Sequence, residues 1–374
     1  MIDPLSKRLY LDYNATAPLR PQAKQVMMQV LEYTGNPSSI HFFGRKMHGI
    51  MEQARSRVTS IFGLKDNQCI FTASCTEANN MVLRGNVAPQ IMVSATEHDS
   101  VRLALPNPKI LPVSQDGVVD LNHLENFLKK NESPVLVSVM IANSETGVIQ
   151  PIDDIVNICK KFGAFVHTDA TQAIGRIPVN IQKIDFTTFS SHKLGGPFGC
   201  GVVLLGSSTN INPMLFGGGQ ERGRRAGTEN IPAIAGFAAA LELAVSEQTQ
   251  QSNQLQIWRM ILEQQMQETR PDLVVHGKNT PRLPNTICYS IPGIPQIQQL
   301  MNFDLEGVAV SSGSACSSGK VRHSHVLQAM GLSADLTSSA IRLSMGWNTK
   351  KPDIDHFMKV WHKLYKRPVL SNNV

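Results

Sequence analysis

The chain has 374 residues, and 42% of them are hydrophobic, which is ordinary for a soluble globular enzyme and sufficient for one large domain and a smaller one. Lys and Arg outnumber Asp and Glu by 35 to 29, which gives a formal net charge of +6. These charges are scattered and rarely alternate with aromatic residues, so no direct nucleic-acid partner is expected. The six cysteines are widely spread, and no two have the two-residue gap of a zinc or redox motif. Neither a disulfide framework nor a metal site is therefore expected.

No segment has the composition of a targeting signal or a membrane span. The first twelve residues contain neither the apolar stretch of a signal peptide nor an Arg- and Ser-rich amphipathic run, so the cytoplasm is the expected compartment. The most apolar segment, Ile231 to Val245, is rich in Ala and interrupted by Glu242. It is shorter than the roughly 20 apolar residues that cross a bilayer. We predict a buried helix there and no membrane partner.

Short apolar runs rich in β-forming residues alternate with helical patterns along the first two thirds of the chain. Helical spacing of the apolar residues extends from Arg45 to Phe62 and from Ile152 to Phe162. This alternation predicts an α/β fold with a mainly parallel sheet covered by helices. The strand-like runs are Ile91 to Ser94, Val135 to Ile141, Ala164 to Thr168, Asp185 to Phe189 and Gly201 to Leu205.

The composition changes to Gln and Ser from Glu247 to Gln267, as expected of a polar-faced helix that leaves the large domain. We therefore predict a large domain over residues 13–250 and a smaller α+β domain made of residues 1–12 and 251–374. The elements predicted for the small domain are strands at Thr286 to Ile291, Val308 to Val310 and Ala340 to Met345, and a closing helix from Ile354 to Leu364.

Polar residues follow several of the predicted strands, where an open α/β sheet collects its ligands. Lys193 comes shortly after one strand, and a partly buried lysine can form a Schiff base with an aldehyde because its pKa is lowered. Asp169 ends another strand and could keep a pyridine nitrogen protonated, which makes that ring an electron sink. Either residue alone is more often a solvated loop charge. Their joint appearance, with His98 after a third strand, predicts a pyridoxal 5'-phosphate site.

A phosphate group requires backbone N–H groups at a helix start and small hydroxyl donors. The run from Ser74 to Glu77 precedes a helical pattern and supplies both, and Ser190 and His192 lie beside the lysine. The alternative for Thr76 is that it merely begins an ordinary capped helix, so the phosphate prediction depends on its neighbours.

One cysteine lies in a run of very small residues. Ser311 to Gly319 contains only Ser, Gly, Ala and Cys316, which cannot pack a core and are typical of a mobile, exposed loop. A free cysteine is usually a buried hydrophobe. Four others, each beside an apolar residue, fit that description: Cys69, Cys159, Cys200 and Cys288.

Together these residues resemble the cysteine desulfurases, the sulfur-donating branch of the class V aminotransferase fold among fold-type I pyridoxal-phosphate enzymes. The resemblance covers nearly the whole chain in family order. Besides the cysteine loop, the matching segments are Tyr10 to Thr16, Gly35 to His41, His167 to Gln172, Ser191 to Lys193, Gly217 to Asn230 and Ile341 to Ser344.

The resemblance implies a role for each site residue. Lys193 would hold the cofactor, Asp169 would face the ring nitrogen, Gln172 would face the phenolic oxygen, and His98 would stack on the ring as an acid and base. Arg342 would clamp the substrate carboxylate, whose shape a planar guanidinium matches. The other implied residues are Thr76, Ser190 and His192 at the phosphate, with Cys75 beside them, and Asn14 and Ser144 near the substrate.

The implied reaction converts L-cysteine to L-alanine and leaves a persulfide on Cys316, which passes its sulfur to an acceptor protein. The long small-residue loop resembles the branch that serves iron-sulfur cluster assembly. Family members are homodimers, so Thr228 of one subunit would reach the phosphate held by the other. Relatives commonly have Asn at the position of Ser144, Lys at the position of Phe198 and Ala at the position of Cys75.

Two alternatives stand beside this prediction. Another enzyme of the fold, such as a selenocysteine lyase or a small aminotransferase, would share Lys193 and Asp169, but transamination needs no thiol such as that of Cys316. A catalytically degenerate sulfur-transfer scaffold would lack some of these groups, whereas His98 and the other three are all present. The sequence leaves the acceptor open among a cluster scaffold, tRNA thiolation and DNA sulfur modification.

Overall fold

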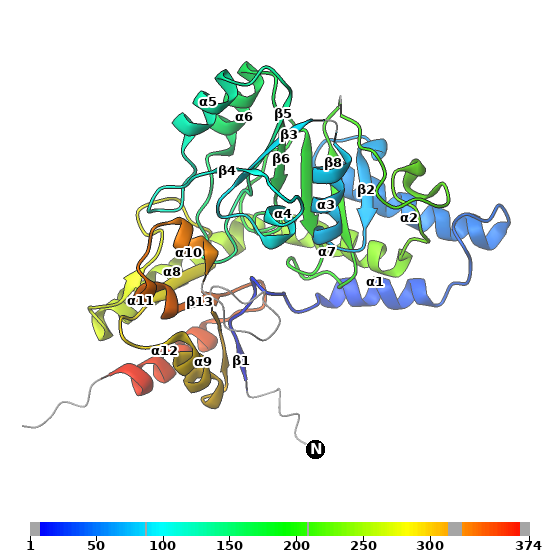
Figure 1. Cartoon of the computed structure of the whole chain (residues 1–374). Helices are drawn as coiled ribbons and strands as arrows, with labels where there is room; N and C mark the ends of the chain where they lie inside the picture. The colour runs from blue at the N-terminus through cyan, green and yellow to red at the C-terminus, as the bar shows by residue number, and fades with distance from the viewer. Residues whose placement is uncertain (1–7, 87, 208, 313–323, 367–374) are drawn as a thin grey trace, which may run out of the picture.

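The computed structural model describes residues 8–86, 88–207, 209–312 and 324–366. In Figure 1 a larger body of sheet and helices occupies the upper right, and a smaller one lies at the lower left. Each body has its own buried apolar clusters. The helix α8 (Gln248–Thr269) follows the last helix of the large body and packs on the small one. The proposed boundary near residue 250 falls in its first turn.

A seven-stranded sheet forms the centre of the large body. The strand order is β2-β8-β7-β6-β5-β3-β4. The pairings among β3 to β7 are parallel, whereas β8 is antiparallel to both of its neighbours. The prediction of an α/β fold with a mainly parallel sheet is therefore confirmed. The strands are β2 (Cys69–Thr72), β3 (Gln90–Ser94), β4 (Lys109–Leu111), β5 (Val135–Ser138), β6 (Phe165–Asp169), β7 (Phe186–Ser190) and β8 (Gly201–Leu205).

Both faces of this sheet are buried. Successive side chains of each strand point to opposite sides of the sheet, and the two sets belong to different apolar clusters. On β2, Cys69 and Phe71 join the larger apolar cluster, whereas Ile70 joins a second cluster on the other face. In the part of the chain that the structure describes, no helix is long and apolar enough to cross a membrane. The helices of the large body are α1 (Pro21–Leu31), α2 (Phe42–Ile61), α3 (Cys75–Gly85), α4 (Asp99–Arg102), α5 (Leu121–Lys129), α6 (Ile152–Lys161) and α7 (Ile231–Ser246), and short 3₁₀ helices cover Asp66–Gln68 and Gln220–Gly223.

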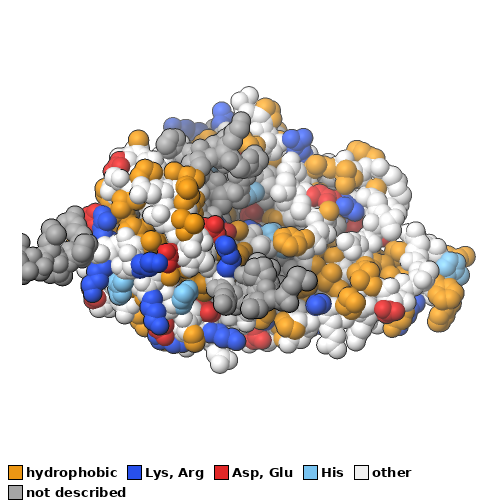
Figure 2. Space-filling view, turned by 90° about the horizontal axis from the view of Figure 1, so that it is seen from below, with side chains coloured by type: hydrophobic (Ala, Val, Ile, Leu, Met, Phe, Trp, Pro, Cys, Tyr) orange, Lys and Arg blue, Asp and Glu red, His pale blue; other side chains and the backbone are white. Residues whose placement is uncertain are grey.

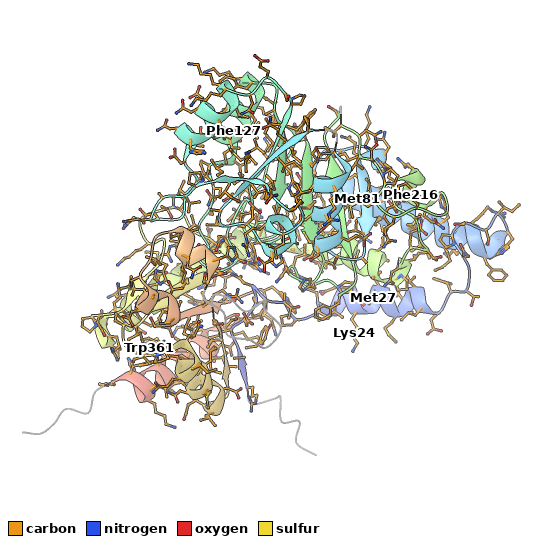
Figure 3. All side chains as sticks on the ribbon, viewed as in Figure 1. Lys24, Met27, Met81, Phe127, Phe216 and Trp361 are labelled. Atoms are coloured by element: carbon orange, nitrogen blue, oxygen red, sulfur yellow. The ribbon has the colours of Figure 1, made fainter. Side chains whose placement is uncertain are left out.

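Close packing between helices explains the buried character of α7. It is buried over most of its length, as predicted, and it contacts both α1 and α2. A Cβ at Gly236 would lie 2.6 Å from Cγ of Met27 on α1, so only glycine permits this approach. Figure 3 shows Met27 on α1 and Met81 on α3, which covers the sheet's other face.

The small body contains a four-stranded antiparallel sheet in the order β12-β13-β10-β9 and a parallel pair of β1 with β11. Aromatic side chains fill its core, with Trp361 stacked against Phe303 and packed edge-on against Tyr289; Figure 3 shows Trp361 among these elements. The elements are β1 (Leu9–Tyr10), β9 (Val274–Val275), β10 (Thr286–Ser290), β11 (Val308–Ala309), β12 (Ser311–Ser312), β13 (Ala340–Ser344), α9 (Gln296–Leu305), α10 (His325–Ala329), α11 (Ala334–Ser338) and α12 (Lys351–Tyr365).

The run Val135 to Ile141 forms a shorter strand than predicted, since β5 ends at Ser138. Beyond Ser138, the backbone N–H groups of Val139 and Ile141 still donate hydrogen bonds to the backbone carbonyl oxygens of His167 and Asp169 on β6. It then turns so that Met140 lines a cavity beyond the sheet. The apolar character of this run therefore belongs partly to a pocket wall.

Candidate active site

A cavity of about 400 Å³ lies at the carboxyl ends of the parallel strands, where ligands of open α/β sheets bind. Residues of β6, β7, α3 and β13 meet there, so both bodies contribute to its walls. The predicted site residues that line it are Asn14, Cys75, Thr76, His98, Ser144, Asp169, Gln172, Ser190, His192, Lys193 and Arg342. The structure thus brings together every predicted site residue except Thr228 and Cys316.

Asp169 ends β6 and is held in one orientation by two donors. Its Oδ2 accepts a hydrogen bond from Asn79 Nδ2 at 2.9 Å, and its Oδ1 accepts one from the Thr171 backbone N–H at 2.9 Å. The Cys75 thiol lies 3.6 Å from Oδ2. Burial, and then the charge of Asp169, raise the pKa of Cys75 well above its ordinary value. Cys75 is therefore a neutral thiol, and the fixed carboxylate is the group suited to face a pyridine nitrogen.

Lys193 lies in the turn after β7. Its Nζ donates hydrogen bonds to the backbone carbonyl oxygens of Asn14 at 2.5 Å and Ala15 at 2.6 Å. The turn requires glycine after the lysine, because Gly195 has φ +90° and a Cβ at Gly196 would collide with Ser191 Oγ. The amine is thereby placed at the cavity wall.

His98 caps the short helix α4. Its Nδ1 accepts a hydrogen bond from the Ser100 backbone N–H at 3.1 Å and lies 2.8 Å from Ser100 Oγ. Because a backbone N–H can only donate, Nδ1 of the neutral ring carries no proton and Nε2 carries it. His98 can thus present an N–H group at Nε2.

The start of α3 and the loop after β7 form a set of donors on one side of the cavity. Ser74 caps α3 by accepting a hydrogen bond from the Glu77 N–H at 3.1 Å, and Thr76 follows in the first turn. Ser190 Oγ is buried and has no hydrogen-bond partner within the described ranges. Burial, and then the charge of Lys193, lower the pKa of His192 to about 4, so its ring is neutral near pH 7. An unsatisfied hydroxyl beside a helix N-terminus fits a phosphate group.

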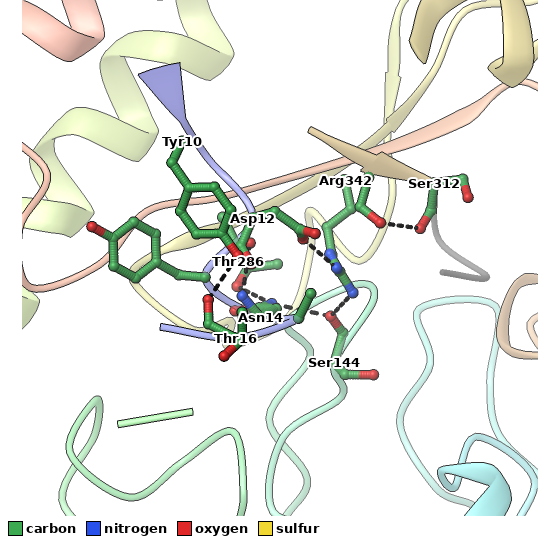
Figure 4. Close-up of polar contacts among 12 residues, drawn as sticks. Tyr10, Asp12, Asn14, Thr16, Ser144, Thr286, Ser312 and Arg342 are labelled. Atoms are coloured by element: carbon green, nitrogen blue, oxygen red, sulfur yellow. Dashed lines mark hydrogen bonds and ion pairs between the residues drawn. The ribbon is translucent and has the colours of Figure 1, made fainter. Parts of the chain in front are cut away.

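Arg342 on β13 of the small body lines the same cavity, and Figure 4 shows it between Asp12 and Ser144. Its buried guanidinium donates from Nη1 to the Ser144 carbonyl at 3.1 Å and from Nη2 to Asp12 Oδ1 at 2.5 Å. The Ser144 carbonyl also accepts a bond from Asn14 Nδ2 at 3.0 Å. Nε is buried and has no partner among the residues that the structure describes. A carboxylate ligand would complete this guanidinium.

Gln172 is held at the cavity wall by the N-terminal segment. Its Nε2 donates to the Asn14 carbonyl at 3.1 Å, and its Oε1 accepts a hydrogen bond from Arg176. Arg176 also donates to Asn14 Oδ1 at 2.8 Å. Asn14 therefore contacts Gln172, Arg176, Lys193 and Ser144 at once, and connects several parts of the cavity wall.

Two predicted residues are not among the described residues that line this cavity. Thr228 is exposed and lies outside the cavity lining. Cys316 lies outside the described residues, which resume at Ser324. Their predicted roles remain predictions.

Sequence reasoning missed two carboxyl groups near the cavity. Asp12 lies within the segment that carried the family resemblance, but its contact with Arg342 depends on the folded chain. Glu97 is fully buried; its Oε1 accepts the Met140 N–H at 2.6 Å, and its Oε2 has no partner in the described ranges. Burial, and then the charge of Asp169, raise the pKa of Glu97 well above its ordinary value.

The remaining cysteines behave as predicted: Cys69, Cys159, Cys200 and Cys288 are buried. Within the described ranges, no group of three or more His, Cys, Asp or Glu side chains is placed to hold a metal ion.

Comparison with known proteins places these residues in a family. The model of the family described as Aminotransferase class-V matches residues 9–357. The cysteine desulfurase IscS of Dictyoglomus turgidum is 36% identical over 380 residues, which cover 97% of this chain and 96% of that protein. The cysteine desulfurase of Nostoc sp. is 37% identical over 374 residues, with coverage of 96% and 93%.

Among solved structures, a NifS-like protein from Rickettsia africae superposes with a TM-score of 0.89 at 35% identity. The alignment covers 96% of this chain and 99% of that one. Class-V aminotransferases and cysteine desulfurases depend on pyridoxal phosphate, so the predicted cofactor is confirmed. The chain belongs to the class-V aminotransferase family, in which its relatives carry the names cysteine desulfurase and NifS-like protein.

Proposed function

We propose that this protein is a pyridoxal-phosphate-dependent cysteine desulfurase, which converts L-cysteine to L-alanine and carries the released sulfur as a persulfide on Cys316. The observation that supports this most directly is the convergence of Lys193, Asp169 and Arg342 on one cavity. The first two suit the cofactor, and the third, with its unsatisfied Nε, suits the carboxylate of an amino acid.

The residues present fit the cofactor. Asp169 would face the ring nitrogen, Lys193 would hold the aldehyde carbon, and the unsatisfied Ser190 hydroxyl, with Thr76 and His192, would bind the phosphate. Bound pyridoxal phosphate supplies an electron sink for the electrons of the substrate's Cα–H bond. Gln172 and Ser144, which line the same cavity, would contact the phenolic oxygen and the substrate respectively.

Each residue then has a task in the reaction. Arg342 binds the substrate carboxylate, and Lys193 takes up the α-proton as a general base. The Cys316 thiolate attacks the substrate sulfur, so that a sulfur–sulfur bond forms while the substrate's carbon–sulfur bond breaks. The electron pair of the broken bond stays with the substrate carbon, which takes up a proton and leaves as alanine. His98, with its proton on Nε2, is placed to exchange protons at the cavity wall.

We further propose a homodimer. Large hydrophobic side chains are exposed around α1 and the start of α2, among them Leu31 at 62%, Ile40 at 89% and Phe42 at 67%. Figure 2 views the molecule from below and shows hydrophobic side chains gathered on the half of that surface that lies away from the small body. Contiguous exposed apolar surface marks an interaction site. The exposed Thr228 would then reach the phosphate of the second subunit's site.

The sulfur acceptor would be a protein of iron-sulfur cluster assembly, and the reaction would take place in the cytoplasm. A test incubates the purified protein with L-cysteine, measures alanine, and identifies the persulfide by mass spectrometry. We expect alanine in proportion to cysteine consumed and an added sulfur on Cys316. A Cys316→Ser variant that forms alanine at the parental rate would contradict the proposal.

A further inference from the structure

The described residues on either side of the segment that carries Cys316 contact residues in or beside the walls of the proposed catalytic cavity. On one side, residue 313 follows Ser312 of β12. In the β12–β13 ladder Ser311 pairs with Arg342, and Figure 4 shows Ser312 beside this arginine. On the other side, the described chain resumes at Ser324. The contacts of Ser324 and of the next residue, His325, reach the opposite wall.

Ser324 is buried and makes two hydrogen bonds. Its Oγ donates to Glu145 Oε2 at 2.5 Å and accepts the Leu327 N–H at 3.1 Å, which caps α10. Glu145 is itself buried and follows Ser144 of the cavity wall. Its backbone N–H donates to Asn143 Oδ1 at 2.9 Å, so the carboxylate lies on a fixed turn. A hydroxyl bond to a carboxylate is among the stronger side-chain bonds.

His325 makes the second attachment. Its Nε2 lies 2.9 Å from the backbone carbonyl oxygen of Glu97, and since that oxygen can only accept, the ring donates. Glu97 directly precedes His98 of the cavity wall. The chain that follows the cysteine segment is therefore bonded to the cavity wall at two points. Ser324 binds the residue after Ser144, and His325 binds the residue before His98.

We propose that Ser324 and His325 are positioning residues for sulfur transfer: their bonds to Glu145 and to the Glu97 carbonyl fix, beside the cavity, the chain that directly follows the cysteine-bearing segment. This inference rests on the proposed function of Cys316. A reacting group that is held near its target reacts in an effectively unimolecular step, and a displacement of about 1 Å can lower the rate about a hundredfold. Substrate binding by Arg342 needs neither attachment.

The chain offers a matched control for Ser324. Ser333 caps α11 in the same manner, by accepting the Leu336 N–H at 3.4 Å, and α10 and α11 both have five residues. Ser333 is exposed. Ser324→Ala and Ser333→Ala each remove one helix cap, but only the first removes the bond to Glu145. Ser324→Thr retains the hydroxyl, and His325→Gln retains an N–H donor that His325→Leu lacks.

Alanine formation, persulfide formation on Cys316 in a single turnover, and alkylation of Cys316 by iodoacetamide without substrate are measured for each variant. We expect Ser324→Ala and His325→Leu to lower kcat and persulfide formation about ten- to hundredfold. The KM for cysteine and the absorbance change of the cofactor on adding cysteine should stay as in the parent. Alkylation should not slow, because neither substitution changes the thiol itself. Ser324→Thr, His325→Gln and Ser333→Ala should retain most of the parental kcat.

Three results are decisive. If Ser324→Ala and His325→Leu match Ser333→Ala in kcat, the positioning role is wrong although the proposed function stands. If they instead raise KM and abolish the cysteine-induced absorbance change, the two residues serve the substrate pocket and the inference also fails. If Cys316→Ser forms alanine at the parental rate, the proposed function itself fails, and this variant separates that case from the other two.

Discussion

Asp12 and Arg342 form an ion pair at the edge of the cavity, with 2.5 Å between Oδ1 and Nη2. The arginine side chain is only 3% exposed, whereas the aspartate side chain is 19% exposed. A buried cation requires a compensating anion. In the free protein Asp12 supplies it, and on the proposed assignment the substrate carboxylate would add a second negative charge in the substrate complex.

We therefore expect Asp12→Asn to destabilise the free protein and to bind amino acids more tightly. Breaking a buried pair costs about 3–5 kcal/mol because one charge is left uncompensated, and the partial exposure of Asp12 reduces this cost. A bound carboxylate restores the compensation, while the bond to the Ser144 carbonyl still orients the guanidinium. Thermal unfolding with increasing L-alanine should show a lower Tm without ligand and a larger rise on saturation than in the parent. A smaller rise would mean that Asp12 orients Arg342 for its ligand.

Lys193→Ala should abolish turnover and the yellow absorbance of the lysine-bound cofactor. The amine is the group proposed to hold the aldehyde, and the methyl group of alanine cannot replace it. Lys183→Ala is the matched control, because Lys183 is exposed and does not line the cavity. Absorbance spectra and alanine formation test both variants. Retained colour and activity in Lys193→Ala would contradict the cofactor assignment.

Most of the fold and much of the site could be predicted from the sequence, because strand-end residues of a parallel sheet meet at one edge. The residues after β3, β6 and β7 lie around one cavity on that principle. The sequence pattern does not predict strands β2 and β4, of four and three residues; runs this short do not reveal a strand by periodicity alone, although the equally short runs Ile91 to Ser94 and Val308 to Val310 are predicted.

The roles of Asp12 and Ser324 could not be predicted, because each depends on a partner far along the chain. Asp12 meets Arg342 at a separation of 330 residues, and Ser324 meets Glu145 at a separation of 179. A lone Asp or Ser in the sequence is most often a solvated residue or a helix cap. Only the folded chain brings these groups together. Asp12 meets Arg342 within the small body, where it lies beside β13, whereas Ser324 meets Glu145 where the small body packs on the large one.

A dimer with shared sites should recover activity when two inactive variants are mixed. Lys193→Ala removes the lysine of its own site, and Thr228→Ala removes the hydroxyl proposed to act in the other subunit's site. In a mixed dimer, one site has both an intact lysine and an intact threonine. We expect alanine formation to return in part after subunit exchange, which native mass spectrometry can verify. Exchange without recovered activity would count against a role for Thr228 across the interface.

The stability of the protein should fall as the pH drops from about 6.5 toward 4, in part because of His276. Burial lowers the pKa of this ring to about 4, and its Nε2 lies 2.7 Å from Ser290 Oγ. Between the ordinary histidine pKa of the unfolded chain and the lowered pKa of the folded chain, the unfolded chain binds the proton and the folded chain does not. The free energy of unfolding therefore falls by up to roughly 1.4 kcal/mol for each pH unit in this range. His276→Gln should lose less stability than the parent between pH 7 and pH 5 in urea unfolding. Equal losses would show that His276 does not carry this dependence.

Ser144 supports the site through its backbone, and its side chain lines the cavity. Its carbonyl oxygen accepts hydrogen bonds from Arg342 and Asn14, and these bonds do not depend on the side chain. An Asn at this position would keep them and add an amide donor beside the proposed substrate carboxylate. One hydrogen bond to a charged group is worth about 1.5–3 kcal/mol, or roughly one to two decades in kcat/KM.

We expect Ser144→Asn to raise kcat/KM for cysteine, mainly through a lower KM if the added bond is equally strong in the ground and transition states. A water molecule that bridges Ser144 to the substrate would reduce the gain. Steady-state alanine formation by the parent and the variant, at matched cofactor occupancy, provides the measurement. Ser144→Ala is the control, since it removes the hydroxyl and adds no donor. If kcat/KM of Ser144→Asn is unchanged or lower, the neighbouring residues are adapted to serine, and the larger amide then crowds the cavity without adding a contact to the substrate.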